Sequence, residues 1–349
     1  MKVLAVINQK GGVGKTTACV NLGAALARQG LRVLLVDLDP QAHLSISFDQ
    51  VPPVGEPSIY TLLGGRHELE TVVRPTSTES LFLAPTNLDL SGAETEFSAE
   101  IGRETLLRDA LENWVTGGGE VDVVLMDCPP SLGLLSLNAL VAADHVLLPV
   151  QAEFYALQGM AQLLDVMDRV QRRLNPSLDV IGVLVGLYSK QRRLSQEVLD
   201  ELDRHFGELV ITPFIRVNVR LAEAPSHAQT IFQYSPRSGA AEDFTAIARV
   251  LGERLELLEP LPPPREDIDI QGWDRHSAEE PHIAPKEATH NFPVDDAAAP
   301  VTTPANGAHL AAKNGNANLP VTPSAGFAKE ESEWGAAWAR AVGSAPDED

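Results

Sequence analysis

Continuous apolar segments alternate with amphipathic stretches along the first 258 residues of the chain. The five apolar segments are KVLAVI (2–7), RVLLVD (32–37), DVVLMD (122–127), HVLLPV (145–150) and VIGVLVG (180–186). Apolar runs without polar alternation are typical of strands that are buried on both faces of a sheet. The helical patterns between them cover 16–29, 156–174, 195–206 and 239–257. This alternation predicts an α/β fold with a mostly parallel twisted sheet flanked by helices on both sides.

The alternating pattern stops near residue 258. Residues 259–349 contain 12 of the 25 prolines, and their 16 acidic and 6 basic residues give a net charge of −10. Proline, charge and the loss of apolar periodicity are typical of disorder. We therefore expect a folded domain at 1–258 and an acidic, Pro-rich disordered tail at 259–349. Trp334 and Trp338 lie four residues apart in EWGAAWARAV, which leaves open either a short docking helix or an apolar segment of the tail.

Composition narrows the class of protein further. The net charge of −21 excludes a protein that coats nucleic acid over its whole surface, although it allows a local basic patch. No apolar run is long enough to span a bilayer, and the first apolar run is too short for a signal peptide. Cys19 and Cys128 are far apart and lack metal-site spacing, so we expect buried thiols in a reducing compartment. These features predict a cytoplasmic protein.

A glycine-rich loop follows the first predicted strand and precedes the first predicted helix, within NQKGGVGKTTACVNLG (8–23). This order is the context of a phosphate-binding P-loop. Its backbone N–H groups can surround a phosphate, and the positive end of the helix faces the anion. Lys15 is expected to reach the β- and γ-phosphates, and the Thr16 hydroxyl to ligate Mg²⁺. The predicted nucleotide-binding residues of this loop are Gly11, Gly12, Val13, Gly14, Lys15, Thr16 and Thr17.

The loop departs from the strict pattern GxxxxGK[ST], because Gln9 stands where the first glycine belongs. The string fits KGGxGK[ST], and in this it resembles the ParA/MinD group of ATPases, more closely the ParA/Soj partition type. In that group the early lysine reaches the nucleotide of a second subunit, in a face-to-face dimer that holds two ATP molecules. The resemblance implies that Lys10 binds nucleotide and stabilises γ-phosphate charge in trans. It also implies that Gly12 must stay small where the partner subunit approaches.

Two acids follow the second predicted strand in LLVDLDPQ (34–41). Asp39 resembles the switch I aspartate of the family, which positions the attacking water. The resemblance therefore makes Lys10, Lys15 and Asp39 the expected catalytic residues. For Asp37 the sequence leaves two interpretations open, a second-shell acid near Mg²⁺ and an ordinary helix cap or turn residue.

The strand in VDVVLMDCPPSLG (121–133) ends at Asp127, which has the position of a Walker B acid. There it can hold Mg²⁺, so Thr16 and Asp127 are the expected metal-site residues. CPPSLG resembles the switch II of the family, a segment that can respond to the γ-phosphate. PVQAEFYALQG (149–159) resembles a family segment near the dimer surface.

The end of the domain, from Arg216 to residue 251, is close to the Soj pattern, so the resemblance covers about residues 1–257. It implies that Asn218 lies near the adenine base. The chain reads IRVN at 215–218 where Soj-type proteins usually have IPRN, and Ser189 stands where they often have aspartate. Residues 169–220 hold nine basic and six acidic residues, and Soj-type dimers bind DNA through this part of the chain. The expected DNA-contacting residues are Arg192, Arg193, Arg216 and Arg220.

The resemblance implies an ATPase of chromosome or plasmid partition with ATP and Mg²⁺ as cofactors. It would form a homodimer with ATP, bind non-specific nucleoid DNA, and leave it when a ParB-like activator stimulates hydrolysis. One alternative is an orphan ParA-like ATPase that positions a protein cargo. A MinD-like ATPase acting at a membrane surface would need a basic amphipathic helix, whereas this sequence closes with SAPDED. We therefore expect no membrane partner.

Overall fold

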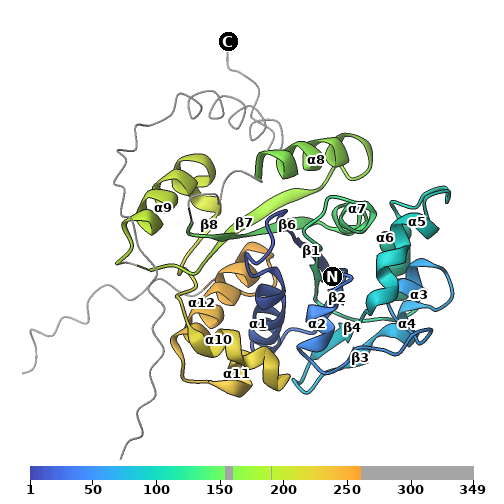
Figure 1. The fold of residues 1–349 in the computed structure, drawn as a ribbon, viewed down its shortest axis with the longest axis horizontal. Helices are drawn as coiled ribbons and strands as arrows, with labels where there is room; N and C mark the ends of the chain where they lie inside the picture. Colours follow the sequence, from blue (N-terminus) through green and yellow to red (C-terminus); the bar gives the residue numbers. More distant parts are fainter. Residues whose placement is uncertain (154–159, 190, 261–349) are drawn as a thin grey trace, which may run out of the picture. The chain divides into compact units, whose positions relative to one another are not determined.

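The computed structural model describes residues 1–153, 160–189 and 191–260. Their strands form one sheet in the order β3-β4-β2-β5-β1-β6-β7-β8 (Figure 1). The strands are β1 (Lys2–Val6), β2 (Val33–Asp37), β3 (Arg74–Pro75), β4 (Leu81–Ala84), β5 (Val123–Asp127), β6 (His145–Gln151), β7 (Asp179–Gly186) and β8 (Val210–Ile211). The β3–β4 pair is antiparallel, and the other pairs are parallel. The predicted mostly parallel sheet is confirmed.

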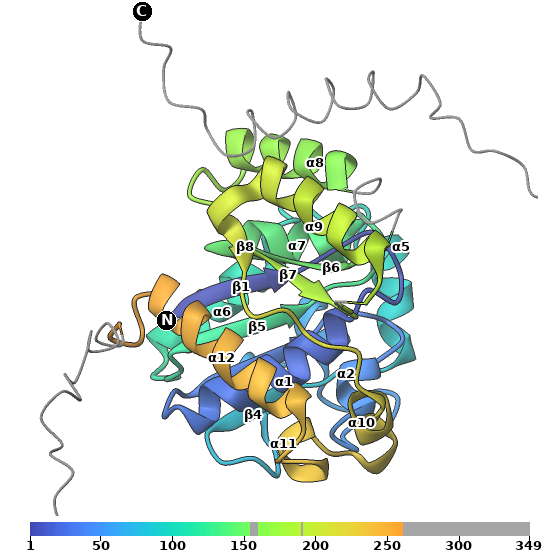
Figure 2. The ribbon, with the colours of Figure 1, turned by 90° about the vertical axis from the view of Figure 1, so that its left-hand side faces the viewer.

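Helices cover both faces of the sheet (Figures 1 and 2). One face is packed by α1 (Lys15–Arg28), α2 (His43–Ile46), α11 (Ile231–Tyr234) and α12 (Gly239–Arg254). The other is packed by α3 (Ile59–Leu63), α4 (Leu69–Val72), α5 (Ala93–Glu96), α6 (Leu106–Thr116), α7 (Leu134–Ala142), α8 (Met160–Arg173) and α9 (Arg193–Phe206). The short helix α10 (Val219–Glu223) and the 3₁₀ turns Leu88–Gly92, Gly207–Leu209 and Ala224–His227 complete the described elements.

The apolar strands separate two cores because successive side chains point to opposite faces. On β1 and directly after it, Val3, Ala5 and Ile7 pack into the core beneath α7, whereas Leu4 and Val6 pack into the core beneath α1 and α12. Both sets are buried, which explains why these strands have no polar alternation. β1 lies between β5 and β6, so the glycine-rich loop starts at the centre of the sheet.

The five predicted strands agree with β1, β2, β5, β6 and β7 to within one residue at each end. The predicted helices at 16–29, 195–206 and 239–257 correspond to α1, α9 and α12, and α8 covers the described part of 156–174. Sequence analysis did not identify β3, β4 or β8, which have two to four residues each. The predicted disordered tail lies outside the described residues, apart from Glu259 and Pro260.

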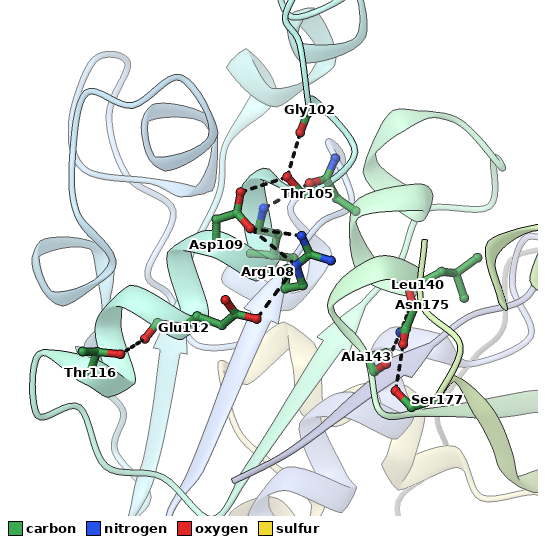
Figure 3. Close-up of polar contacts among 12 residues, drawn as sticks. Gly102, Thr105, Arg108, Asp109, Glu112, Thr116, Leu140, Ala143, Asn175 and Ser177 are labelled. Atoms are coloured by element: carbon green, nitrogen blue, oxygen red, sulfur yellow. Dashed lines mark hydrogen bonds and ion pairs between the residues drawn. The ribbon is translucent and has the colours of Figure 1, made fainter. Parts of the chain in front are cut away.

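Buried amide side chains satisfy backbone groups where elements meet. Asn175, in the turn before β7, donates to the carbonyl oxygens of Leu140 at 3.0 Å and Ala143 at 2.6 Å. Ser177 donates to the Asn175 Oδ1 atom at 2.9 Å (Figure 3). These bonds satisfy carbonyl groups at the end of α7, which the helix itself cannot pair. They fasten α7 beneath the end of the sheet opposite the glycine-rich loop.

Candidate functional site

The loop between β1 and α1 encloses open space at the carboxyl edge of the sheet. Gly12 has a φ of +75° and Gly14 a φ of +91°, a region that side chains disfavour. A Cβ atom placed on Gly11, Gly12 or Gly14 would meet no neighbouring atom within 4 Å. Gly14 caps α1 without a side-chain hydrogen bond, so the first N–H groups of α1 are available to an anion. The loop therefore has the form of a phosphate cradle.

Lys15 and Asn8 hold the two sides of this loop. Lys15 is almost fully buried, and its Nζ lies 3.4 Å from the carbonyl oxygen of Lys10. Asn8 donates to the carbonyl oxygen of Pro149 at 2.8 Å and accepts from the Lys10 N–H at 3.0 Å. Asn8 thus fastens the loop to β6, which lies next to β1 in the sheet but 141 residues further along the chain. Sequence analysis missed Asn8, because its role depends on a contact across 141 residues.

Lys10 lies on the exposed side of the loop. Its Nζ forms an ion pair with the Glu153 carboxylate at 3.1 Å, and the Lys10 side chain is 32% exposed. An ion pair at this exposure stabilises the fold little, so exchanging partners costs little free energy. The chain's own carboxylate therefore neutralises Lys10 beside the cradle, and Lys15 alone of the two ammonium groups is buried in it.

Asp127 ends β5 beside the cradle, as predicted, with its side chain buried. Neither of its carboxylate oxygens has a well-formed hydrogen bond within the described residues. Burial and the nearby Asp37 hold the pKa of Asp127 well above its usual range, against the opposing effects of Thr16 and Lys15. A buried carboxylate oxygen next to a threonine hydroxyl is a suitable donor set for Mg²⁺, which takes few protein ligands and completes its shell with phosphate and water.

Asp37 is the parallel ladder partner of Asp127 on β2. Its Oδ2 accepts hydrogen bonds from the Ser45 N–H at 2.8 Å and the Ser45 hydroxyl at 2.7 Å. The Ser45 hydroxyl in turn accepts from the Thr86 N–H at 2.9 Å. Burial raises the pKa of Asp37 to about 7, with the Ser45 hydrogen bonds opposing the rise. Asp37 therefore fastens α2 to the sheet. The sequence could not indicate this role, because it depends on the contact with Ser45.

Asp39 lies half-buried in the turn that follows β2. Its Oδ1 accepts from the Gln41 N–H at 2.9 Å, and its carbonyl oxygen accepts from the Ala42 N–H at 2.8 Å. The turn thus uses one carboxylate oxygen, and the other has no hydrogen-bond partner in the described ranges. Oδ2 of Asp39 can therefore orient a water, whereas Oδ1 holds the turn through Gln41.

A cavity of about 160 Å³ opens beside the cradle between the carboxyl ends of β6 and β7 and the segment before α10. Its lining includes Gly12, Val13, Gly14, Thr17, Pro149, Gln151, Leu184, Gly186, Leu187, Ile215, Asn218, Leu221, Ala222 and Phe244. Asn218 accepts from the Arg220 N–H at 2.9 Å through Oδ1, so its amide N–H₂ can donate into the cavity. A mostly apolar wall with two amide side chains, of which Gln151 donates to the Gly12 carbonyl oxygen, suits a planar heterocyclic base.

The four predicted DNA-contacting arginines lie on two neighbouring segments, which are joined by a bridge between Tyr188 and Arg216. Arg192 precedes α9 and is exposed. Arg193 pairs with Glu197 at 2.9 Å, and Arg220 pairs with Glu223 at 3.1 Å. The contacts of Arg216 are internal, chiefly to Asp243, and its guanidinium nitrogens Nε and Nη2 are directed at them.

Comparison with known proteins identifies the family. Residues 1–180 match a family model described as an AAA domain. The chain is 43% identical to sporulation initiation inhibitor protein Soj of Bacillus subtilis over 248 residues, which is 71% of this chain and 97% of that protein. It is 45% identical to chromosome-partitioning ATPase Soj of Thermus thermophilus over 253 residues, 72% of this chain and 96% of that one. The chain belongs to the ParA/Soj family.

A solved structure has a similar sequence and fold. The crystal structure of a Mycobacterium smegmatis protein, described as cobyrinic acid a,c-diamide synthase with bound ATP analog and magnesium, is 38% identical. It superimposes with a TM-score of 0.63 and covers 72% of this chain and 95% of that chain. The resemblance inferred from KGGxGK[ST] is confirmed by these relatives. The expected roles of individual side chains in this ParA/Soj member remain predictions.

The remaining expectations concern the thiols and the membrane. Cys19 and Cys128 are both free and buried in the structure, as predicted, and burial raises the pKa of each thiol. Within residues 1–153, 160–189 and 191–260, no helix has the length and apolar character needed to cross a bilayer.

The raised pKa of Asp37 predicts a pH-dependent stability of the nucleotide-free, Mg²⁺-free protein. Between about pH 4 and pH 7 the folded chain keeps a proton that the unfolded chain has released, so stability falls as the pH rises through this window. Asp37→Asn removes this loss and keeps an oxygen that accepts from Ser45. We expect the free energy of unfolding of Asp37→Asn to exceed that of the parent by about 2–4 kcal/mol at pH 8 and by little at pH 4.

Urea denaturation across this pH range measures the effect. Glu79→Gln, which changes an exposed carboxylate, is the control and should follow the parent. If the free energies of unfolding of Asp37→Asn and the parent change with pH in parallel, the raised pKa of Asp37 is contradicted.

Proposed function

We propose that the chain is a Mg²⁺-dependent ATPase of chromosome or plasmid partition that acts as an ATP-bound homodimer on DNA. The observation that carries this proposal is the meeting of an open phosphate cradle with the buried Asp127 carboxylate at the end of β5, beside Thr16 and Lys15. The name of the Thermus thermophilus relative, chromosome-partitioning ATPase Soj, supports the same function.

The chain's residues divide the work of ATP hydrolysis. N–H groups from Gly11 to Lys15 bind the phosphates, and Lys15 neutralises the β- and γ-phosphates. Thr16 and Asp127 hold Mg²⁺, which supplies positive charge to the triphosphate when bound. Asp39 orients the attacking water with the oxygen that the turn leaves unpaired, and Asn218 donates to the base.

Lys10 makes hydrolysis depend on a second subunit. In the structure its ammonium is exposed and neutralised by Glu153 rather than directed into its own cradle. In the ATP-bound dimer, Lys10 exchanges this partner for the γ-phosphate of the other subunit. Gly12, which is exposed on the same loop, allows the close approach.

DNA binding follows from the exposed arginines at the carboxyl edge. Arg192, Arg193 and Arg220 contact phosphates, and any contact from Arg216 uses the part of its guanidinium not bound to Asp243. A dimer doubles these contacts, so ATP strengthens DNA binding. A ParB-like activator then stimulates hydrolysis and releases the monomer. The protein is cytoplasmic in this account and nucleoid-associated when ATP-bound.

The role of Lys10 predicts that Lys10→Ala binds a slowly hydrolysed ATP analogue within about threefold of the parent, because Lys15 and the loop N–H groups remain. It should remain a monomer in sedimentation velocity, whereas the parent dimerises. Glu153→Gln is the matched variant, since it removes the other half of the ion pair and should dimerise at equal or lower analogue concentration. Equal dimerisation of Lys10→Ala and the parent would exclude the role in trans.

The DNA face predicts that the analogue-bound dimer binds random-sequence DNA with a slope of log affinity against log salt of about −0.9 per phosphate neutralised. Arg220→Glu should weaken this binding for all sequences alike and leave ATP turnover without DNA unchanged. Arg32→Glu is the control, because Arg32 is also an exposed arginine in an ion pair, with Glu120, at the opposite edge of the sheet. Fluorescence anisotropy measures both.

If the analogue-bound dimer does not bind DNA at low salt, the proposed role in chromosome or plasmid partition is wrong. An orphan ParA-like ATPase that positions a protein cargo, or a MinD-like ATPase at a membrane surface, would then replace it.

A further inference from the structure

Arg216 makes a dense set of internal contacts for a side chain that is half-exposed. Its guanidinium Nε lies 3.0 Å from both carboxylate oxygens of Asp243, and Nη2 lies 2.7 Å from Asp243 Oδ1. Nη2 also donates to the Gly239 carbonyl oxygen at 2.9 Å and to Glu242 at 3.2 Å. The Arg216 backbone N–H donates to Asp243 Oδ2 at 3.1 Å. We call this group the Arg216 clamp.

The clamp is built into the fold rather than formed at the surface. The Asp243 side chain is only 5% exposed, so its charge depends on Arg216 for compensation. A Cβ atom on Gly239 would lie 2.8 Å from Arg216 Cζ, so a side chain at this position would displace the guanidinium from the place it occupies here.

The clamp joins the walls of the base cavity. Ile215 precedes Arg216 and Asn218 follows two residues later, and both line the cavity. Phe244, which follows Asp243 on α12, lines it from the other side. The clamp residues themselves do not line it.

A third wall is attached to the clamp through the backbone. The Tyr188 N–H donates to the Ile215 carbonyl oxygen at 3.1 Å, and the Val217 N–H donates to the Tyr188 carbonyl oxygen at 3.3 Å. Leu187, which precedes Tyr188, also lines the cavity. Arg216 therefore lies where three of the segments that line the cavity meet.

We propose that Arg216, through Asp243, is a positioning residue that sets the shape of the base-binding cavity and thereby the affinity for adenine nucleotides. This inference rests on the proposed ATP binding. The clamp holds Ile215 and Asn218 against Phe244, so the Asn218 amide is oriented before a base arrives. Preorganisation of this kind reduces the ordering cost of binding. The phosphate cradle is fastened to β6 by Asn8, through contacts that involve none of the clamp residues.

The test compares ligands with and without a base. Isothermal titration of the full chain with ATP, ADP and inorganic tripolyphosphate, each with Mg²⁺, separates the cavity from the cradle. Arg216→Met combined with Asp243→Asn removes the clamp without leaving a buried unpaired charge. We expect the Kd for ATP and for ADP to rise about fivefold to tenfold, the worth of one well-placed hydrogen bond, and the Kd for tripolyphosphate to stay unchanged. The single variant Arg216→Lys keeps the positive charge beside Asp243. Its affinity for ATP should lie between that of the double variant and that of the parent.

Arg254→Met is the matched control. Arg254 also fastens α12, at its other end, by donating to the carbonyl oxygens of Ile181 at 2.7 Å and Glu208 at 2.6 Å. Its loss should lower the melting temperature and leave the three Kd values unchanged.

Three results would overturn the inference: unchanged ATP affinity in the double variant, equal weakening of ATP and tripolyphosphate, or the same loss of ATP affinity in Arg254→Met. If the parent chain itself binds no ATP, the proposed function fails as well. Failure of the clamp alone is therefore distinguishable from failure of ATP binding.

Discussion

The buried carboxylate of Asp127 is the constraint on which the rest of the site depends. Keeping this carboxyl out of water costs free energy, either as a buried charge or as the proton that its raised pKa makes it take up, and β5 places it at the centre of the sheet edge. Asp37 on the neighbouring strand increases the cost, since its carboxylate is also buried. Lys15 and Thr16 offset only part of it. The buried acids at this edge of the sheet therefore favour binding of a cation, and the adjacent cradle favours binding of the anion that accompanies it.

Parallel strands explain why these groups converge although they are far apart along the chain. β1, β2 and β5 are neighbours in register, with Val6 and Asp37 both opposite Asp127. Their carboxyl ends consequently bring the phosphate cradle, the Asp39 turn and Asp127 to one place. The base cavity is added by β6, β7 and the segment before α10. The helix α10 that follows this segment carries Arg220, so the proposed nucleotide and DNA contacts belong to one continuous stretch of backbone.

The strands, the main helices and the phosphate cradle could be predicted because their signals are local. Apolar runs identify β1 and β5, and glycine spacing identifies the loop. The contacts that fix the site geometry could not be predicted, since each joins residues distant in sequence. Asn8 binds Pro149 across 141 residues, and Lys10 meets Glu153 across 143. Arg216 illustrates the difficulty most clearly: its charge suggested a DNA contact, whereas most of its hydrogen bonds are to α12.

The central claim is that Asp127 is a metal-site carboxylate held at a cost in the ligand-free fold. Differential scanning calorimetry of the parent and Asp127→Asn, with and without Mg²⁺ and a slowly hydrolysed ATP analogue, tests it most directly. Without ligands, Asp127→Asn should melt at a higher temperature than the parent, because the amide avoids the cost of burying the acid. With the analogue present, Mg²⁺ should raise the melting temperature of the parent and leave that of Asp127→Asn nearly unchanged. An equal Mg²⁺-dependent gain in both proteins would contradict the account.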